Sequence, residues 1–207
     1  LGDDGSTPER PGNRGRGVVA DATTAQRKPL MRMLLLSDTH GFVEPFVQAL
    51  ARSADCVVHA GDIGGLEVIE AVTPVRGKLV AVRGNNDWPE SWPGAAKAGV
   101  LDLGEVAEVD LPGGLLVVEH GHRIWDTRHY HKRLRAKYPK ARAIVYGHTH
   151  IRCADLDQAP WVLNPGAAGR ERTKGGSSCI LLEAGRHKWK VSEYRNGQIS
   201  ASDCHRA

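Results

Sequence analysis

The 207-residue chain has an apolar fraction of 41% and a charged fraction of 25%, which are typical of a globular protein. Its length fits one domain with a sizeable core, and its net charge of +4 is too small to indicate nucleic-acid binding by itself. No apolar run approaches the ~20 residues that a membrane-spanning helix needs.

Residues 1–29 are rich in Gly, Pro, Asp, Arg and Thr and have no apolar periodicity, which predicts a disordered leader. Two interpretations of this leader stay open. It is partly an artefact of the assigned start, since Met31 and Met33 lie just before the first predicted strand, or it is a targeting segment. We expect residues 30–207 to form a single domain.

The first half of this domain alternates apolar runs with amphipathic segments. Apolar residues between 42 and 54 follow helical spacing, and Pro45 falls in the first turn, where proline is tolerated. The pattern predicts, in chain order, a strand over 34–36, a helix over 42–54, a strand over 56–60, a helix over 66–72 and a strand over 79–82. This alternation predicts a parallel sheet covered by helices.

The second half is predicted to consist mainly of short strands. Residues 106–110 and 115–119 flank Pro112-Gly113-Gly114, a pattern typical of a hairpin. A basic helix is predicted over 127–138, and further strands over 143–146, 152–156, 161–163, 178–182 and 188–194. We therefore expect an α/β protein with two sheets packed face to face and helices outside.

Polar side chains end five of the predicted strands, and strand ends of this kind gather at one edge of an α/β fold. The seven side chains are Asp38, His40, Asp62, Asn85, His120, His148 and His150. Their oxygen and nitrogen donors suit Mn, Fe or Zn better than thiophilic ions. Seven ligands exceed what one ion with an open position uses. The set therefore predicts two ions about 3.5–4 Å apart with one bridging carboxylate.

Each of these motifs has a simpler interpretation when it is taken alone. A lone histidine at a strand end, such as His59, is most often a hydrogen-bonded structural residue. Gly61-Asp62 or Asn85-Asn86 alone is usually a turn, and His148-Thr149-His150 alone fits a mononuclear zinc fragment. Their joint occurrence, each at the end of a predicted strand, favours the dinuclear site.

As an ordered set, these motifs resemble the calcineurin-like metallophosphoesterase superfamily and, more narrowly, its small prokaryotic phosphodiesterase branch. The motifs are Ser37-Asp38-Thr39-His40-Gly41, Gly61-Asp62-Ile63, Arg83-Gly84-Asn85-Asn86-Asp87, His120-Gly121-His122, Gly147-His148-Thr149-His150 and Asn164-Pro165-Gly166. The resemblance implies a four-layer α-β-β-α sandwich. It also implies two divalent metal ions, commonly Mn²⁺, with Ni²⁺, Fe²⁺ or Zn²⁺ as alternatives.

Carried over position by position, the resemblance implies one metal ion on Asp38, His40 and His150, and the other on Asn85, His120 and His148. Asp62 would bridge the two ions. Two such cations hold a hydroxide in line with phosphorus and neutralise phosphoryl oxygens.

Three further residues are weaker candidates. Asp87 is expected to orient a metal ligand from behind, as carboxylates often do for metal-bound histidine. His122 is a candidate to hydrogen-bond the phosphate or to protonate the leaving oxygen, and a structural role for it is an equal alternative. Asn86 is a candidate for substrate contact.

The chain departs from the family pattern at two positions. Asn86 stands where the wider superfamily has a proton-donating histidine, and this disfavours monoesters, whose poor leaving group benefits most from a general acid. Ala167 stands where the branch usually has serine after Asn-Pro-Gly. Arg170, Arg172 or Lys174 in the loop beyond could meet substrate phosphate, although solvated loop charges are the commoner explanation.

Residues 123–142 carry eight basic residues against Asp126 alone. This stretch could steer a polyanionic substrate, although a solvated helix face is the commoner explanation. The four cysteines are scattered, and we expect free thiols in a reducing cytosol.

The sequence therefore predicts a cytoplasmic, metal-dependent phosphodiesterase that acts on a small or nucleotide-like phosphodiester and has no membrane partner. One alternative is a phosphomonoesterase. Another is a non-catalytic scaffold of the same fold, like a retromer subunit of this superfamily that departs from the ligand pattern. Nuclease activity is less favoured because the chain has no appended nucleic-acid domain. Whether the chain forms a homo-oligomer stays open.

Overall fold

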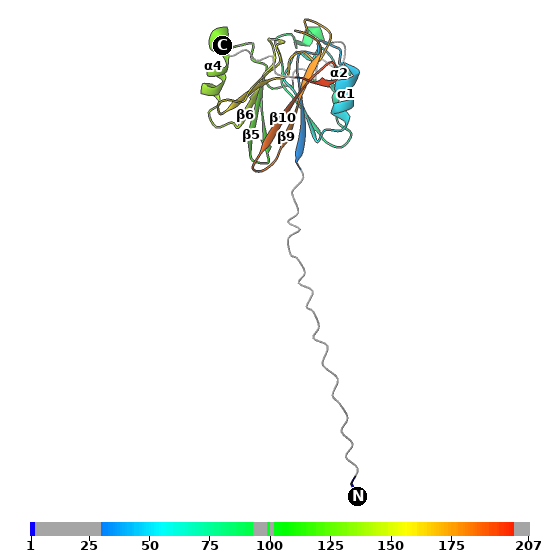
Figure 1. The fold of residues 1–207 in the computed structure, drawn as a ribbon. Helices are drawn as coiled ribbons and strands as arrows, with labels where there is room; N and C mark the ends of the chain where they lie inside the picture. Colours follow the sequence, from blue (N-terminus) through cyan, green and yellow to red (C-terminus); the bar gives the residue numbers. More distant parts are fainter. Residues whose placement is uncertain (3–29, 93–98, 100–101, 201–207) are drawn as a thin grey trace.

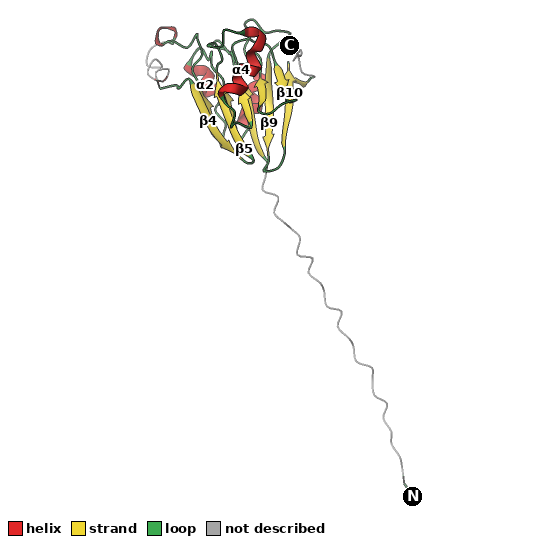
Figure 2. Ribbon diagram, turned by 90° about the vertical axis from the view of Figure 1, so that its left-hand side faces the viewer, coloured by secondary structure: helices red, strands yellow, loops and turns green. Residues whose placement is uncertain are grey.

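Two β-sheets lie between helices in the computed structural model, which describes residues 1–2, 30–92, 99 and 102–200 (Figures 1 and 2). The elements are, in chain order, β1 (Met31–Leu36), α1 (Pro45–Arg52), β2 (Cys56–His59), α2 (Leu66–Val72), β3 (Lys78–Ala81), the 3₁₀ turn η1 (Pro89–Ser91), β4 (Val106–Leu111), β5 (Gly114–Glu119), the 3₁₀ turn η2 (Thr127–His129), α4 (Tyr130–Lys137), β6 (Ala143–Val145), β7 (Cys153–Asp155), β8 (Trp161–Asn164), β9 (Ser178–Ala184), β10 (Trp189–Arg195) and β11 (Gln198–Ile199).

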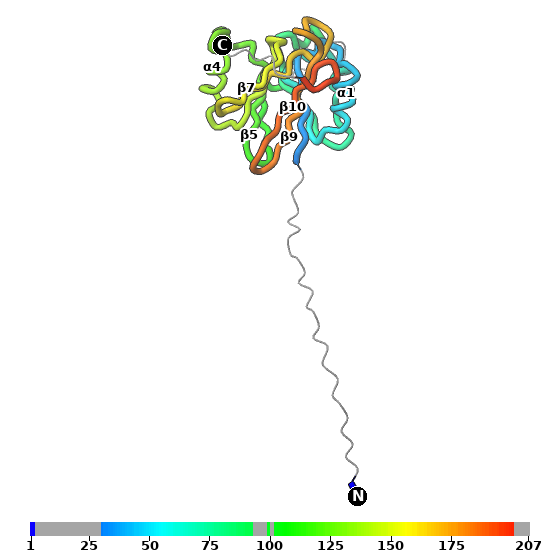
Figure 3. The backbone as a smooth tube through the Cα atoms, viewed as in Figure 1, coloured from blue at the N-terminus to red at the C-terminus, as the bar shows by residue number. Residues whose placement is uncertain are grey.

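The two sheets are mixed, and each contains three neighbouring parallel strands. The first has the order β11-β10-β9-β1-β2-β3, with β1, β2 and β3 parallel. The second has the order β4-β5-β6-β8-β7, with β5, β6 and β8 parallel. In Figure 3 the late strand β9 returns beside the start of β1, with which it pairs in antiparallel fashion. Because parallel strands end at the same edge, each sheet gathers its carboxyl ends on one side.

The alternation of side chains along β1 shows the layers. Met33 and Leu35 point into the core between the two sheets, where they pack with Leu116 and Val145 of the second sheet. Leu34 and Leu36 point to the opposite face, which α1 and α2 cover. The second sheet is covered in the same way by α4, which buries Leu134. The α-β-β-α sandwich expected from the sequence is therefore confirmed (Figure 1).

Most of the predicted disordered leader, residues 3–29, lies outside the described part of the chain. Within the described residues, no helix is both long and apolar enough to cross a bilayer.

One expectation about the cysteines is wrong. Cys56 and Cys179 are free and buried, as expected for thiols inside apolar runs. Cys153, however, is disulfide-bonded. It lies on β7, the edge strand of its sheet, where a covalent link from outside the sheet can reach it. Spacing along the chain gave no sign of this pairing, and Cys204 lies outside the described residues.

Candidate metal centre

The seven predicted ligands follow β1, β2 and β3 of the first sheet and β5 and β6 of the second. The sandwich therefore supplies donors from both sheets to one place. An extended backbone would point the two side chains after β1 in the same direction. Instead, Asp38 and His40 both have the left-handed backbone conformation, with φ of 53° and 48°. The chain turns at this point, and the two side chains still converge.

This left-handed conformation recurs at the other loops. Among non-glycine residues of the described chain, φ is positive at Asp38, His40, Asp62, His148, His150, Arg172 and Asn196. Five of these seven residues are predicted metal ligands. A side-chain-bearing residue in this region costs roughly 1–2 kcal/mol and persists only where the surroundings impose it. The strain is therefore concentrated where the donors meet.

Four of the predicted ligands form one group, Asp38, His40, Asp62 and His150, whose donor atoms all lie within 4.8 Å of one another and could hold a metal ion. The Nε2 atom of His150 lies 3.3 Å from Oδ1 of Asp38 and 3.4 Å from Nε2 of His40. The two imidazole rings stack with their centroids 5.2 Å apart.

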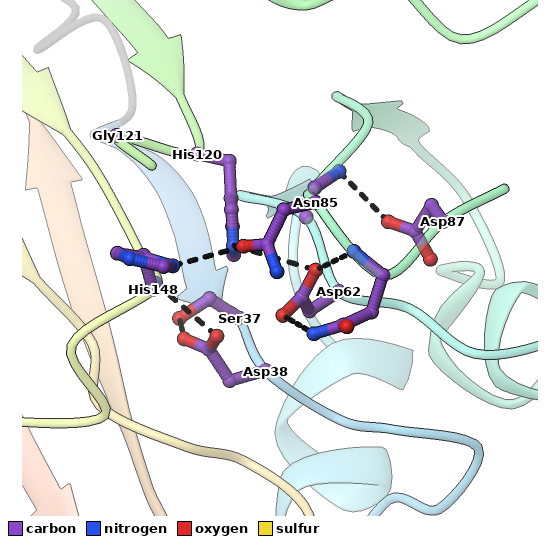
Figure 4. A network of polar contacts seen from close by, with 12 residues as sticks. Ser37, Asp38, Asp62, Asn85, Asp87, His120, Gly121 and His148 are labelled. Carbon is purple, nitrogen blue, oxygen red and sulfur yellow. Dashed lines mark hydrogen bonds and ion pairs between the residues drawn. The ribbon is translucent and has the colours of Figure 1, made fainter. Parts of the chain in front are cut away.

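A second group gathers around the side-chain oxygen of Asn85. That Oδ1 atom lies 2.9 Å from Nδ1 of His148 and 3.1 Å from Nε2 of His120. Figure 4 shows the two imidazoles on the same side of Asn85, with Asp38 and Asp62 beside them.

Asp62 lies between the two groups and contributes one oxygen to each. Its Oδ2 atom is 3.8 Å from Nε2 of His40, and its Oδ1 atom is 3.4 Å from Nε2 of His120. Gly84 makes this position possible, because a Cβ atom there would overlap the Asp62 side chain and its backbone nitrogen. The geometry is that of a carboxylate placed to bridge two sites.

The chemistry of His120 tests whether a divalent cation fits. Its Nδ1 atom is 2.7 Å from the carbonyl oxygen of Ala60, so Nδ1 must donate. In the neutral ring Nε2 then carries only a lone pair, and it faces two acceptor oxygens, those of Asn85 and Asp62. Acceptors that face one another need a cation among them, either a proton or a metal ion. The donor set therefore fits a divalent ion.

The pKa values of the metal-free site reflect the same crowding of charge. Burial raises the pKa of Asp38 to about 7. Burial alone would also raise the pKa of Asp62, but the hydrogen bond and charge of His120 outweigh it and hold this pKa well below its usual value. Burial lowers the pKa of His120, and its contacts with Asp62 and Asp38 outweigh this and raise it. The raised pKa of His120 thus reflects the two carboxylates that surround its ring.

A family model described as a calcineurin-like phosphoesterase superfamily domain matches residues 31–186. The chain belongs to this superfamily. A curated phosphodiesterase of Methanocaldococcus jannaschii is 25% identical over 146 residues, which span 66% of this chain and 83% of the relative.

Solved structures confirm the fold of this phosphoesterase-family chain. Vps29 of Entamoeba histolytica, in a structure of a single mutant, superposes with a TM-score of 0.66 at 18% identity and covers 82% of this chain and 96% of its own. The wild-type protein, complexed with Zn²⁺, gives a TM-score of 0.63 at 17% identity with the same two coverages. The E. coli phosphoesterase YfcE gives 0.56 at 20% identity, covering 83% of this chain and 97% of its own.

Within this phosphoesterase-family site, Asp87 acts through the backbone. Its fully buried carboxylate accepts the N–H groups of Ile63, Gly64 and Gly84 at 2.8–3.1 Å, and the Trp92 indole N–H lies 3.4 Å away. Its hydrogen-bond partners thus include no histidine in the described part of the chain. Asp87 therefore links the backbone just after Asp62 to the backbone just before Asn85. It can thus fix the positions of two predicted ligands at once.

Asn164 gives the Asn-Pro-Gly motif a physical role. Its Nδ2 atom donates to the carbonyl oxygen of Gly147 and to Oγ1 of Thr149, both at 2.9 Å. Its Oδ1 atom accepts the N–H of Gly166 at 2.8 Å. The side chain thus fixes the loop that carries His148 and His150. Sequence reasoning named this motif without finding its function.

The two weaker candidates differ in their surroundings. Asn86 is turned onto Asp62, because its backbone N–H and its Nδ2 atom donate to the two carboxylate oxygens at 2.8 and 2.6 Å. His122 lies beside His120, with ring centroids 5.5 Å apart, and its buried Nδ1 atom has no hydrogen-bond partner among the described residues. Asn86 is exposed and has its Oδ1 atom and one Nδ2 N–H group beyond these two bonds, so both residues stay candidates for substrate contact.

Four of the eight basic residues in the stretch 123–142 pair with carboxylates. Arg123 pairs with Glu105, Arg133 with Asp126, Arg135 with Asp155 and Lys137 with Glu119. This agrees better with an ordinary helix surface than with a field that steers a polyanion.

His59 is a structural residue, as expected for a lone histidine at a strand end. It is fully buried, Nδ1 accepts the N–H of Gly61 at 3.2 Å, and Nε2 therefore donates to Oγ1 of Thr39 at 2.8 Å. Burial lowers its pKa to about 3 from an ordinary 6.5.

This pKa predicts acid sensitivity of the metal-free fold. The unfolded chain binds the His59 proton between pH ~6.5 and about 3 whereas the folded chain does not. The contribution of His59 to stability therefore falls by up to ~1.4 kcal/mol per pH unit as the pH decreases through this window, while the raised pKa of Asp38 acts in the opposite direction. Urea unfolding of the metal-free protein at pH 7, 6 and 5 measures the slope. His59→Asn, which keeps an acceptor for Gly61 without titrating, should flatten it. An unchanged slope in that variant would assign the acid sensitivity to other groups.

Proposed function

We propose that this chain is a divalent-metal-dependent phosphodiesterase that hydrolyses a small or nucleotide-like phosphodiester. The observation that carries the proposal is the position of Asp62, which offers one oxygen to each of two groups of nitrogen and oxygen donors. Membership of the phosphoesterase superfamily and the likeness to a phosphodiesterase support the reaction class.

In this proposal Asp38, His40 and His150 hold one ion, and Asn85, His120 and His148 hold the other, with Asp62 shared. When bound, the ions lower the pKa of a water molecule and neutralise phosphoryl oxygens. The chain orients the ligands, since Ala60 fixes His120, and Asp87 and Asn164 fix the ligand loops. Mn²⁺ is the proposed resident metal, with Ni²⁺, Fe²⁺ or Zn²⁺ as alternatives, because the donor set combines carboxylate and amide oxygens with four imidazole nitrogens.

The preference for a diester is supported by the surroundings of Asn86. This amide stands where a proton-donating histidine would serve a monoester, and its backbone N–H and one Nδ2 N–H group donate to Asp62. A diester with a good leaving group has less need of that acid. His122, whose partly buried ring lies beside His120, is the proposed contact for a substrate oxygen.

The test compares bis(p-nitrophenyl) phosphate with p-nitrophenyl phosphate on metal-stripped protein to which Mn²⁺, Ni²⁺, Zn²⁺, Mg²⁺ or no metal is added. We expect no turnover without metal, restoration by Mn²⁺, and diester cleavage about 10²-fold faster than monoester cleavage. Faster monoester turnover would favour a phosphomonoesterase instead.

The likeness to Vps29 keeps a scaffold of the same fold as the second candidate. Bound metal without turnover of either ester would favour it. A cytoplasmic location also remains a proposal, and the Cys153 disulfide argues against it, because disulfides are rare in a reducing cytosol. Nucleic acid is a less favoured substrate, because half of the basic stretch 123–142 is paired with carboxylates.

A further inference from the structure

Arg172 reaches into the candidate metal centre from the loop between β8 and β9. One of its guanidinium nitrogens, Nη2, lies 3.0 Å from Nε2 of His40. Its charge also lowers the pKa of His40 and His150, in addition to the larger effect of their burial. The sequence offered three cations in this loop without distinguishing among them.

The neighbouring cations of the loop are directed elsewhere. Arg170 pairs with Glu44 at 3.2 Å and lies over the Phe42 ring, 3.6 Å from its centroid. Lys174 is exposed and makes no contact with a predicted ligand. Arg172 is therefore the cation of this loop that faces the site.

The backbone at Arg172 carries the same strain as the ligand loops. Its φ of 51° matches the values of 48–58° at Asp38, His40, Asp62 and His150. A left-handed backbone is energetically unfavourable for arginine, so the surrounding structure must impose it. The position of the side chain is thus built into the loop.

The contact with His40 involves the atom that would hold the metal. Guanidinium has donors only, so Nε2 of His40 must be the acceptor, and one lone pair cannot serve both Arg172 and an ion. Binding of an ion to His40 would leave these guanidinium donors unpaired at the edge of the site. Their planar fork matches two oxygens of a phosphate.

We propose that Arg172 binds the non-bridging oxygens of the substrate's phosphodiester group, exchanging His40 for the phosphate once metal is bound. This inference rests on the proposed function. It makes Arg172 a substrate-binding residue that recognises the phosphate itself rather than either esterified group.

The experiment titrates Mn²⁺ and then inorganic phosphate by calorimetry, with wild type, Arg172→Ala, Arg172→Lys and the control Lys174→Ala, which removes the same charge two residues away. We expect Arg172→Ala to bind Mn²⁺ at least as tightly as wild type, because a competitor for His40 is gone. Phosphate affinity of the Mn²⁺-loaded protein should fall 10- to 100-fold in Arg172→Ala, less in Arg172→Lys, and under 2-fold in Lys174→Ala. KM for the diester should rise most in Arg172→Ala, less in Arg172→Lys and least in Lys174→Ala.

Two results would overturn the inference while leaving the proposed function intact. The first is wild-type phosphate affinity in Arg172→Ala. The second is loss of Mn²⁺ from that variant, which would make Arg172 a support of the metal centre. If Mn²⁺-loaded wild type neither binds phosphate nor cleaves the diester, the proposed function fails and the inference fails with it.

Discussion

Asp62→Ala is expected to lower Mn²⁺-dependent hydrolysis of an activated diester by at least ~10³-fold and to reduce the bound metal below two ions per chain. Asp62 is the residue whose two oxygens face the two donor groups, at 3.8 Å from His40 and 3.4 Å from His120. Removing it takes one ligand from each group at once. It also leaves like-charged ions without the anion between them. Steady-state kinetics and elemental analysis of the dialysed protein measure the two effects.

Two matched variants sharpen this prediction. Asp62→Asn keeps the shape and one oxygen, so it should retain more metal than Asp62→Ala but still lose most activity. Asp110→Ala removes an exposed carboxylate from β4 and should change neither quantity. Diester hydrolysis by Asp62→Ala at the wild-type rate would show that the dinuclear mechanism is wrong.

Asp87→Asn is expected to destabilise the fold by ~2–3 kcal/mol and to weaken metal binding. The carboxylate is fully buried, and Oδ2 accepts the N–H of Gly84 while Oδ1 accepts those of Ile63 and Gly64. In the asparagine variant the amide NH₂ group replaces one carboxylate oxygen. At least one buried backbone N–H then faces another donor and loses its hydrogen bond. The loops that hold Asp62 and Asn85 are then no longer tied together.

Urea unfolding of metal-free protein and Mn²⁺ titration measure these two consequences. Asp55→Asn is the matched control, because its carboxylate also accepts a backbone N–H, that of Arg32, but in an exposed position. It should cost less than ~0.5 kcal/mol. Equal stability and equal metal affinity of Asp87→Asn and wild type would contradict the role assigned to Asp87.

The elements of the fold could be predicted from the sequence because they follow local rules. The predicted helix over 66–72 has the bounds of α2, and the predicted strand over 161–163 lies within β8. The central strands β1, β2, β5 and β6 are short apolar runs that are followed closely by a glycine or a polar residue, and this pattern is visible without knowing the neighbouring strand. The sandwich followed from the order of these elements, although β11 gave no such signal.

The identity of the seven donors was also visible in the chain, since each ends a strand and the carboxyl ends of parallel strands meet. The way they meet was not. Asp38 and His40 converge through left-handed backbone rather than through an extended strand. Such a conformation costs energy locally and is imposed by contacts with distant loops, for example the N–H of Asp38 with the carbonyl oxygen of Gly61.

The supporting residues depended wholly on contacts between segments remote in sequence. Asp87 holds amides from a loop more than 20 residues earlier, and Arg172 meets His40 across 132 positions. A motif records which atoms a site contains, because donor chemistry belongs to the residue type. Which cation faces a ligand, and which carboxylate fixes a loop, depend on how the two sheets pack.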